Sequence, residues 1–384
     1  MPTVVISAFN VANFPEGGGH FWVYMQYVLG LRGCGCDVYW LERFVTSDDD
    51  ARDAAAIATF LERMARFGLA GRVILMAGPD PARVPAARTE VRGLPAAEAD
   101  AVFGRADLLL NFHYAIDAEL LGRFRRTALV DIDPGLLQFW ISRGQLAVPR
   151  HDVYFTTGET VGTAAARFPD CDLAWVHIRP PVALEHWPPA TNGTGRSMTT
   201  VSAWDSDDWV VDAVTRFENT KRVAFLPFKE LPGLTDQPLE LALFLRTARD
   251  TEDRRLLEQH GWCIRDSRDV AGSPERYRDY IRGSRGEFSC AKASCIRFQN
   301  AWISDRTLCY LASGRPVVVQ DTGPSRYLPD GEGVFRFSTL EQAAAALAAV
   351  NADYGRQRRA ARAIAEAHFD AKQVAARIVA IGTA

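Results

Sequence analysis

A histidine and an aspartate stand at positions where they could take part in acid–base chemistry. His20 follows a glycine turn, Pro15-Glu-Gly-Gly-Gly-His20, and opens an apolar segment that is predicted to be a helix. An imidazole titrates near neutral pH, and a helix N-terminus disfavours its protonated form, so His20 is a candidate proton acceptor. Asp133 follows a buried strand in Asp131-Ile-Asp133-Pro-Gly135, and either aspartate could orient the ring. The alternative is that His20 is a structural residue at the helix start.

A second set of candidates lies at the start of a short helix predicted after Ser304. Ser304 is a good N-cap, and Asp305 stands in the first turn, where the helix dipole favours an acid. The first N–H groups of a helix have no partner within it and can bind phosphate. Asp305 could also accept hydrogen bonds from hydroxyl groups such as those of a ribose. We therefore predict a donor site at Ser304, Asp305, Arg306 and Thr307, although an ordinary helix–strand unit would show the same spacing.

Polar residues also follow two predicted strands in the first half of the chain. Asn111-Phe-His113 ends one strand, and the helix after the Pro134-Gly135 turn carries Trp140. Ligands of open α/β sheets bind beyond the carboxyl ends of the strands. His113 and Trp140 are thus candidate ligand-binding residues, with a hydrogen-bonded structural histidine as the alternative for His113.

The glycines before His20 are a weaker signal. A strand, a glycine turn and a helix open a Rossmann-type unit, but the spacing does not match the dinucleotide fingerprint. Gly18 and Gly19 suggest that a ligand approaches the backbone closely, and a tight turn alone is the alternative.

Two series of buried strands alternating with helices must position these residues. Strands are predicted at 3–9, 37–41, 72–76, 107–112, 127–132 and within 151–159, and again at 199–204, 239–245, 262–265, 287–290 and 317–319. This alternation predicts parallel sheets covered on both faces. Prolines and the polar run Thr191-Asn-Gly-Thr-Gly195 interrupt it. We expect an N-terminal Rossmann-like domain at 1–184, a linker at 185–197, a C-terminal Rossmann-like domain at 198–365, and a last helix at 366–384 that crosses back to the first domain.

Composition narrows the class of protein. The chain has 384 residues, 48% of them apolar, and a net charge of −3. This near-neutral charge argues against a nucleic-acid binder that relies on a basic field. The seven scattered cysteines are expected to be reduced thiols in a cytoplasmic protein. No apolar run approaches the roughly 18 residues that a membrane span needs.

The segments around these candidates resemble bacterial glycosyltransferases of the GT-B fold, of the family 1 and family 4 type. The clearest likeness is Ala301-Trp-Ile-Ser-Asp-Arg306, followed by Tyr310-Leu-Ala-Ser-Gly-Arg-Pro-Val-Val318 and Gln320-Asp-Thr-Gly323. Similar motifs occur at 131–140, 151–159 and 280–292, so the likeness covers nearly the whole chain. It implies two Rossmann-like doubly wound domains that face each other across a cleft. The first domain would hold the acceptor and the second a nucleotide-sugar.

The resemblance also implies roles for individual residues. Asp305 stands where retaining members usually place a ribose-binding glutamate. A second glutamate is usual earlier in that motif, where this chain has Arg297, so a retaining outcome is in doubt. Lys221 and Lys292 are expected to contact the diphosphate as point charges, with plain surface charge as the alternative. Glu287 begins a strand, where an ionised group needs a partner or a ligand, and we expect it to contact the donor.

The same resemblance assigns the remaining candidates. Gly18 and Gly19 are expected to contact the donor, and His113 and Trp140 are expected to contact the acceptor.

Inverting members place a general base where this chain has His20. We therefore expect a cytoplasmic, metal-independent hexosyltransferase without a cofactor, which moves a sugar to a small molecule such as a secondary metabolite or an envelope precursor. A nucleotide-sugar 2-epimerase and a catalytically silent partner that activates another transferase are the alternatives. The nucleotide base, the sugar, the acceptor, the stereochemistry and the oligomeric state stay open.

Overall fold

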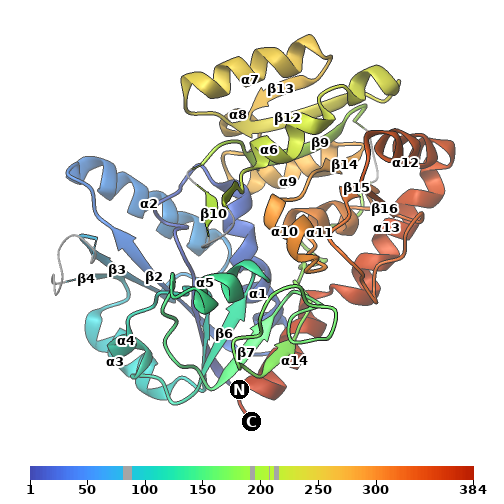
Figure 1. The fold of residues 1–384 in the computed structure, drawn as a ribbon. Helices are drawn as coiled ribbons and strands as arrows, with labels where there is room; N and C mark the ends of the chain where they lie inside the picture. The colour runs from blue at the N-terminus through green and yellow to red at the C-terminus, as the bar shows by residue number, and fades with distance from the viewer. Residues whose placement is uncertain (81–88, 191–194, 207, 212–215) are drawn as a thin grey trace.

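The chain folds into two α/β halves in a computed structural model that describes residues 1–80, 89–190, 195–206, 208–211 and 216–384. The first half, blue to green, lies below the second, yellow to red, and helix α14 returns to the first half (Figure 1). Residues 191–194 of the predicted linker lie outside the described ranges.

An eight-stranded sheet forms the centre of the first half, in the order β4-β3-β2-β1-β5-β6-β7-β8. Its strands are β1 (Thr3–Ser7), β2 (Asp37–Val45), β3 (Val73–Gly78), β4 (Glu90–Gly93), β5 (Leu108–Asn111), β6 (Thr127–Asp131), β7 (Val153–Thr156) and β8 (Trp175–His177). The helices of this half are α1 (Gly18–Gly33), α2 (Asp50–Arg66), α3 (Ala96–Arg105), α4 (Ala118–Leu121) and α5 (Leu136–Ser142). Strands β5 and β6 are buried at every residue, as expected for parallel strands covered by helices on both faces.

The second half contains a six-stranded sheet in the order β13-β12-β9-β14-β15-β16, and all of its paired strands are parallel. The strands are β9 (Met198–Ala203), β12 (Leu239–Phe244), β13 (Cys263–Asp266), β14 (Gly286–Ser289), β15 (Val317–Gln320) and β16 (Val334–Phe337). An antiparallel pair, β10 (Trp209–Val211) and β11 (Arg216–Glu218), follows β9. The helices are α6 (Lys221–Phe225), α7 (Ala248–Gln259), α8 (Ser267–Ala271), α9 (Pro274–Gly283), α10 (Ala293–Phe298), α11 (Asp305–Ala312), α12 (Leu340–Ala352), α13 (Tyr354–His368) and α14 (Ala371–Gly382).

The strands predicted from buried apolar runs are all present, within a few residues of the expected bounds. Strands β4, β8, β10, β11 and β16 were not predicted. Most are three or four residues long, and β4 and β8 contain no buried residue, so they lack the apolar run that identifies a strand. The last helix, predicted at 366–384, begins at Ala371, because α13 ends at His368 and the helical conformation breaks before α14.

The order of the strands reverses at one point in each sheet. β1 lies between β2 and β5, and β9 lies between β12 and β14. In each sheet, the loops that leave the two strands at the reversal therefore turn to opposite sides of the sheet. They open a crevice at the carboxyl ends of these strands, where ligands of such sheets bind. The fold thus offers one candidate crevice at β1/β5 and another at β9/β14.

The chain passes between the halves twice. The first crossing begins near Val182, the second lies between Phe369 and Ala371, and the two lie side by side. The N–H of Val182 donates to the carbonyl of Phe369 at 2.7 Å, and the N–H of Ala371 donates back to Val182 at 3.0 Å. Helix α14 then packs on α1. This contact requires Gly30, because a Cβ there would lie 2.4 Å from the carbonyl oxygen of Ala371.

Helix α1 also contacts the second half directly. The indole N–H of Trp22 donates to the carbonyl of Pro274 at 2.9 Å, and its ring meets Trp187 of the first crossing at 5.0 Å between centroids. Tyr277 of α9 belongs to the same apolar cluster. One core thus continues through both halves and holds the two crevices in a fixed relation.

Candidate functional site

The first turn of helix α11 lies beside the crevice of the second half. The hydroxyl of Ser304 caps it by accepting the N–H of Arg306 at 3.3 Å, and Asp305 is half-buried at the helix start. Burial raises the pKa of Asp305, and the neighbouring Arg306 opposes this shift. Thr307 is only 2% exposed, so its predicted contact with a donor is not supported by the geometry. Asp305 remains the accessible side chain of this turn, and the helix dipole adds a partial positive charge at the same place.

Glu287 and Arg306, both predicted to contact the donor, are paired with each other instead. The Arg306 Nε lies 2.8 Å from Glu287 Oε1, and its other nitrogens donate to the Val201 carbonyl at 2.9 Å and the Ser289 hydroxyl at 2.6 Å. Glu287 is 0% exposed. Its second oxygen has no partner in the described part of the chain, and it is closed off from solvent. We correct the prediction: this pair fixes α11 to strands β9 and β14.

Two lysines bring positive charge to the end of β14. The ammonium of Lys221 donates to the carbonyl of Cys290 and lies 5.7 Å from the ring of Trp302, close to the start of α11. Burial, followed by repulsion from Arg306, lowers the pKa of Lys221 to about 8. Lys292 pairs with Asp208 at 2.6 Å; burial lowers its pKa, but the attraction of Asp208 outweighs this and raises it.

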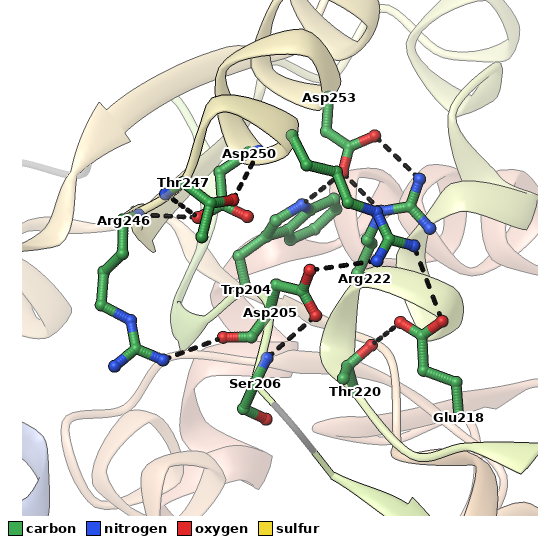
Figure 2. Close-up of polar contacts among 11 residues, drawn as sticks. Trp204, Asp205, Ser206, Glu218, Thr220, Arg222, Arg246, Thr247, Asp250 and Asp253 are labelled. Atoms are coloured by element: carbon green, nitrogen blue, oxygen red, sulfur yellow. Dashed lines mark hydrogen bonds and ion pairs between the residues drawn. The ribbon is translucent and has the colours of Figure 1, made fainter.

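A network of arginines and carboxylates, which the sequence reasoning missed, surrounds Arg222, the residue after Lys221 in α6 (Figure 2). Arg222 pairs with Asp253 at 2.5 Å, and Asp253 also accepts the indole N–H of Trp204 at 2.9 Å. The N–H of Arg222 donates to the Trp204 carbonyl at 3.0 Å, so the two ends of the segment after β9 are joined. Arg249 bridges Asp205 and Glu218 over the same segment. Lys221, the first residue of α6, is therefore the direct neighbour of a residue that this network fixes.

The crevice of the first half is a mainly aromatic hollow of about 410 Å³. It contains both residues predicted to bind the acceptor, and its lining includes Phe9, Tyr24, Phe112, His113, Tyr114, Ile132, Asp133 and Trp140. His113 stacks on Phe9 with centroids 5.0 Å apart. Burial and the charge of Arg43 lower the pKa of His113 to about 4, so this ring is neutral at pH 7.

Asp133 reaches solvent at this hollow and faces the second half. Its carboxylate accepts the Tyr114 hydroxyl at 3.1 Å. The surrounding protein raises the pKa of Asp133, while Lys292 of the second half and the Tyr114 bond oppose the shift. Its backbone N–H is held at 3.0 Å by Asp131, which is 0% exposed and also accepts hydrogen bonds from Gln138 and Thr156. Burial raises the pKa of Asp131 to about 7.

The ring of His20 has one nitrogen occupied and one free. Nε2 lies 2.8 Å from the carbonyl oxygen of Phe9, and a carbonyl only accepts, so Nε2 carries the hydrogen. Nδ1 has no partner among the described residues. Burial lowers the pKa of His20, and the Phe9 bond partly offsets this. The expectation that Asp131 or Asp133 orients the ring is wrong, because the Phe9 carbonyl has that role.

Gly18 and Gly19 contact the second half of the protein. A Cβ on Gly18 would lie 2.3 Å from the carbonyl oxygen of Ser273, and a Cβ on Gly19 would lie 2.7 Å from the ring of Tyr277. The close approach that suggested a ligand is made by the loop before α9 and by α9. The predicted donor contact of these glycines is corrected accordingly.

No protein-family description and no curated protein matches the sequence of this chain. Solved structures do match its shape. HepE of Anabaena in complex with UDP-glucose superposes with a TM-score of 0.57 at 10% identity, covering 99% of both chains. AviGT4, a glycosyltransferase of avilamycin A biosynthesis, gives 0.57 at 14% identity over 99% of this chain and 96% of its own. An α-glucosyltransferase bound to UDP and DNA gives 0.60 at 11% identity over 100% and 99%.

The chain therefore has the GT-B fold, with two Rossmann-like domains. Within the described ranges, no three His, Cys, Asp or Glu side chains gather as metal ligands would. In the same ranges, no helix combines the length and the apolar character needed to cross a membrane.

Proposed function

We propose that this protein is a glycosyltransferase that uses a nucleoside-diphosphate sugar. The observation that carries the proposal is the hydrogen bond from the side-chain amide of Asn300 to the carbonyl of Pro134 at 2.6 Å. Pro134 follows Asp133, which lines the aromatic hollow of the first half, and Asn300 lies in the segment that leads into α11. This bond supports a site in which an acceptor in the hollow and a donor at the start of α11 lie close together, as transfer between two bound molecules requires.

The donor half is suited to a nucleoside diphosphate. In our proposal the diphosphate lies against the first N–H groups of α11, with Lys221 and Lys292 as counter-charges. Asp305 accepts the ribose hydroxyls. When the glycosidic bond to the diphosphate breaks, negative charge grows on the leaving oxygen, and these cations stabilise it.

The acceptor half is suited to a small molecule with a flat or apolar face. His113 and Trp140 line the hollow, and Asp133 can accept a hydrogen bond from a hydroxyl of the acceptor. His20 lies beside the hollow, since Phe9 and Tyr24, which contact its ring, both line it. In our proposal Nδ1 of His20 takes the proton of the attacking hydroxyl while its oxygen forms the bond to the anomeric carbon. This single displacement would invert the configuration.

The first experiment is a thermal-shift screen with UDP-, GDP-, dTDP- and CDP-sugars. HepE was solved with UDP-glucose, so a hexose is the first sugar to test. A specific donor present at 100 times its Kd should stabilise the protein by about 2.7 kcal/mol. Lys292→Ala should lose most of this shift, and Lys229→Ala, which removes a lysine paired with Glu230, should keep it.

The second experiment measures release of the nucleoside diphosphate with panels of small acceptors. Release that depends on an acceptor supports transfer. Binding of a nucleotide-sugar without release would favour the silent partner, and a changed sugar configuration in the recovered donor would favour the epimerase. A protein that no nucleotide-sugar stabilises would refute the proposal.

A further inference from the structure

A second cavity of about 450 Å³ lies between the two halves, apart from the crevices described above. Its walls come from the end of β7, the first crossing, the segment before α11, the loop after β15, and the joint between α13 and α14. The contacts of Asn300 with the Pro134 carbonyl at 2.6 Å and of Gln299 with Thr160 at 3.2 Å stand between the two halves at this point. The cavity thus lies beside two of the contacts that join the halves.

Positive charge dominates the lining of this cavity. Arg179, Arg326 and Arg377 contribute three guanidinium groups, and Glu159 is the single carboxylate among the lining residues. Glu159 is already held by the Ser325 hydroxyl and by the N–H of Arg326. The cavity therefore carries a net positive charge in a protein whose overall charge is −3.

The three arginines differ in how they are held. Arg179 is fixed in the wall, with its guanidinium 3.9 Å from the centroid of the Tyr327 ring and a hydrogen bond of 3.2 Å to the His368 carbonyl. The exposed side chains of Arg326 and Arg377 have no ion pair or hydrogen bond within the described ranges. One guanidinium group that is held in place, with two exposed guanidinium groups beside it, suits an anion that accepts several hydrogen bonds, such as a phosphate group.

The cavity shares a wall with the crevice of the second half, at the start of α11, which we call the donor crevice. Ala301 and Ile303 line the cavity, while Trp302 between them faces Lys221. This wall is held in a restricted conformation, since Ala301 has φ of 55° and its N–H donates to the Thr322 carbonyl at 2.9 Å. The next residues are Ser304 and Asp305 at the start of α11. A ligand bound on one side would hold this wall in the same conformation, and with it the residues that face the donor crevice on the other side.

We propose that this cavity binds a small phosphorylated or polycarboxylate anion, and that the bound anion joins the two halves and strengthens donor binding. The binding part of the proposal stands independently, whereas the coupling to the donor rests on the proposed function. A phosphomonoester such as a hexose phosphate and a free anion such as orthophosphate or citrate share the chemistry that these arginines recognise.

The test is a thermal-shift titration without nucleotide, at constant ionic strength, with orthophosphate, glucose 6-phosphate, citrate and chloride as separate arms. We expect a saturable rise in melting temperature with at least one anion other than chloride. R326A/R377A should lose this rise. The matched control R125A/R255A removes two exposed arginines elsewhere and should keep it. A response to orthophosphate alone would identify the free anion, and a stronger response to glucose 6-phosphate would identify the phosphomonoester.

Lys292→Ala separates this cavity from the diphosphate site. If the anion response survives in Lys292→Ala and disappears in R326A/R377A, the anion binds in the proposed cavity. The opposite pattern would place the anion in the donor crevice and overturn the proposal, as would a wild-type protein that responds to none of the anions. Because nucleotide is absent, this result does not depend on whether the protein transfers sugar.

The coupling is measured by calorimetry with the nucleoside diphosphate that stabilises the protein best. The saturating anion should increase its affinity about 5-fold or more, the lower end of typical coupling between sites. R326A/R377A should bind the nucleotide with the same affinity with and without the anion. An unchanged affinity in the wild type would refute the coupling while leaving the binding site intact.

Discussion

At the scale of single residues, the hydrogen bond between His20 and the Phe9 carbonyl decides which ring nitrogen can act. It leaves Nδ1 as the acceptor, and the burial that lowers the pKa of His20 keeps that nitrogen unprotonated to a lower pH than usual. His113, only a short distance away across Phe9, is also neutral, but it is stacked in the wall of the hollow. In the proposed transfer, the two histidines would therefore have different tasks: His20 would take up a proton, and His113 would contact the acceptor.

His20→Ala should reduce turnover about 10²–10⁴-fold, the usual worth of a positioned base, and leave donor binding nearly unchanged. In the wild type, kcat/KM should fall on the acid side only as the pH drops through the lowered pKa of His20, because protonation removes the acceptor. Steady-state kinetics from pH 5 to 9 in wild type and variant would show this. A variant that keeps most of its turnover would make His20 structural and reopen the retaining outcome.

Asp305→Ala should weaken binding of the nucleoside diphosphate by about 1–3 kcal/mol, the loss expected for a hydrogen bond to a charged group. The reason is that Asp305 is the accessible carboxylate at the start of α11, whereas Glu287 is enclosed. Isothermal titration calorimetry measures the change, with a circular-dichroism spectrum to show that the variant is folded. Equal affinity in a folded variant would exclude the ribose contact.

At the scale of elements, helix α11 is positioned by a buried ion pair. Arg306 reaches β14 through Glu287 and Ser289, and reaches β9 through the Val201 carbonyl. The attraction of Glu287 raises the pKa of Arg306 even though burial acts against the charge. The contact fixes the distance between the helix start and the end of β14. Lys292 follows this strand in the chain, and Lys221 of α6 contacts the Cys290 carbonyl at the same end.

Arg306→Met should destabilise the protein by about 3–5 kcal/mol, because Glu287 would be left as an uncompensated buried charge. The double variant Arg306→Met/Glu287→Met removes both charges and should recover much of this loss. Urea denaturation of the two variants and the wild type gives the comparison. If the single variant were as stable as the wild type, the ion pair could not be what fixes α11.

At the scale of the whole molecule, the halves are packed so closely that two glycines at their contact have no room for a side chain. Gly18 faces the backbone of the loop before α9, and Gly30 faces the backbone of α14. Both glycines belong to α1, which therefore contacts the second half at its beginning and the returning helix near its end. The relation between the two crevices depends on how closely this one helix is packed.

Gly18→Ala should separate the halves, because the new Cβ would meet the carbonyl oxygens of Ser273 and Ala271 at 2.3 and 2.4 Å. We expect a larger radius of gyration by small-angle X-ray scattering and weaker donor binding. Gly104→Ala is the matched control, since a Cβ on this helical glycine meets no atom within 4 Å. A Gly18→Ala protein as compact as the control would show that the interface adjusts without opening.

Much of the architecture could be predicted because it is encoded locally. The buried runs of β1, β5, β6 and β15 identify parallel strands, and Ser304 caps a helix wherever that helix is placed. The polar residues His113 and Asp133, which follow two of the strands, lie around one hollow because the carboxyl ends of parallel strands meet at one edge, and Trp140 of α5 lines the same hollow. The GT-B fold was implied by the resemblance of the motifs to known glycosyltransferases, and the solved structures that match the chain confirm it.

The tertiary structure alone decided which groups satisfy one another. Glu287 could have met a ligand, but it meets Arg306; Gly18 could have admitted a phosphate, but it admits the backbone of Ser273. The partner of His20 is a carbonyl, which has no signature in the sequence. A charged residue in a buried strand needs a partner, and a glycine permits a close approach, wherever the residue lies in the fold. The sequence therefore predicts that some partner exists, but no more. The identity of the partner depends on how distant elements pack, and no local pattern contains that information.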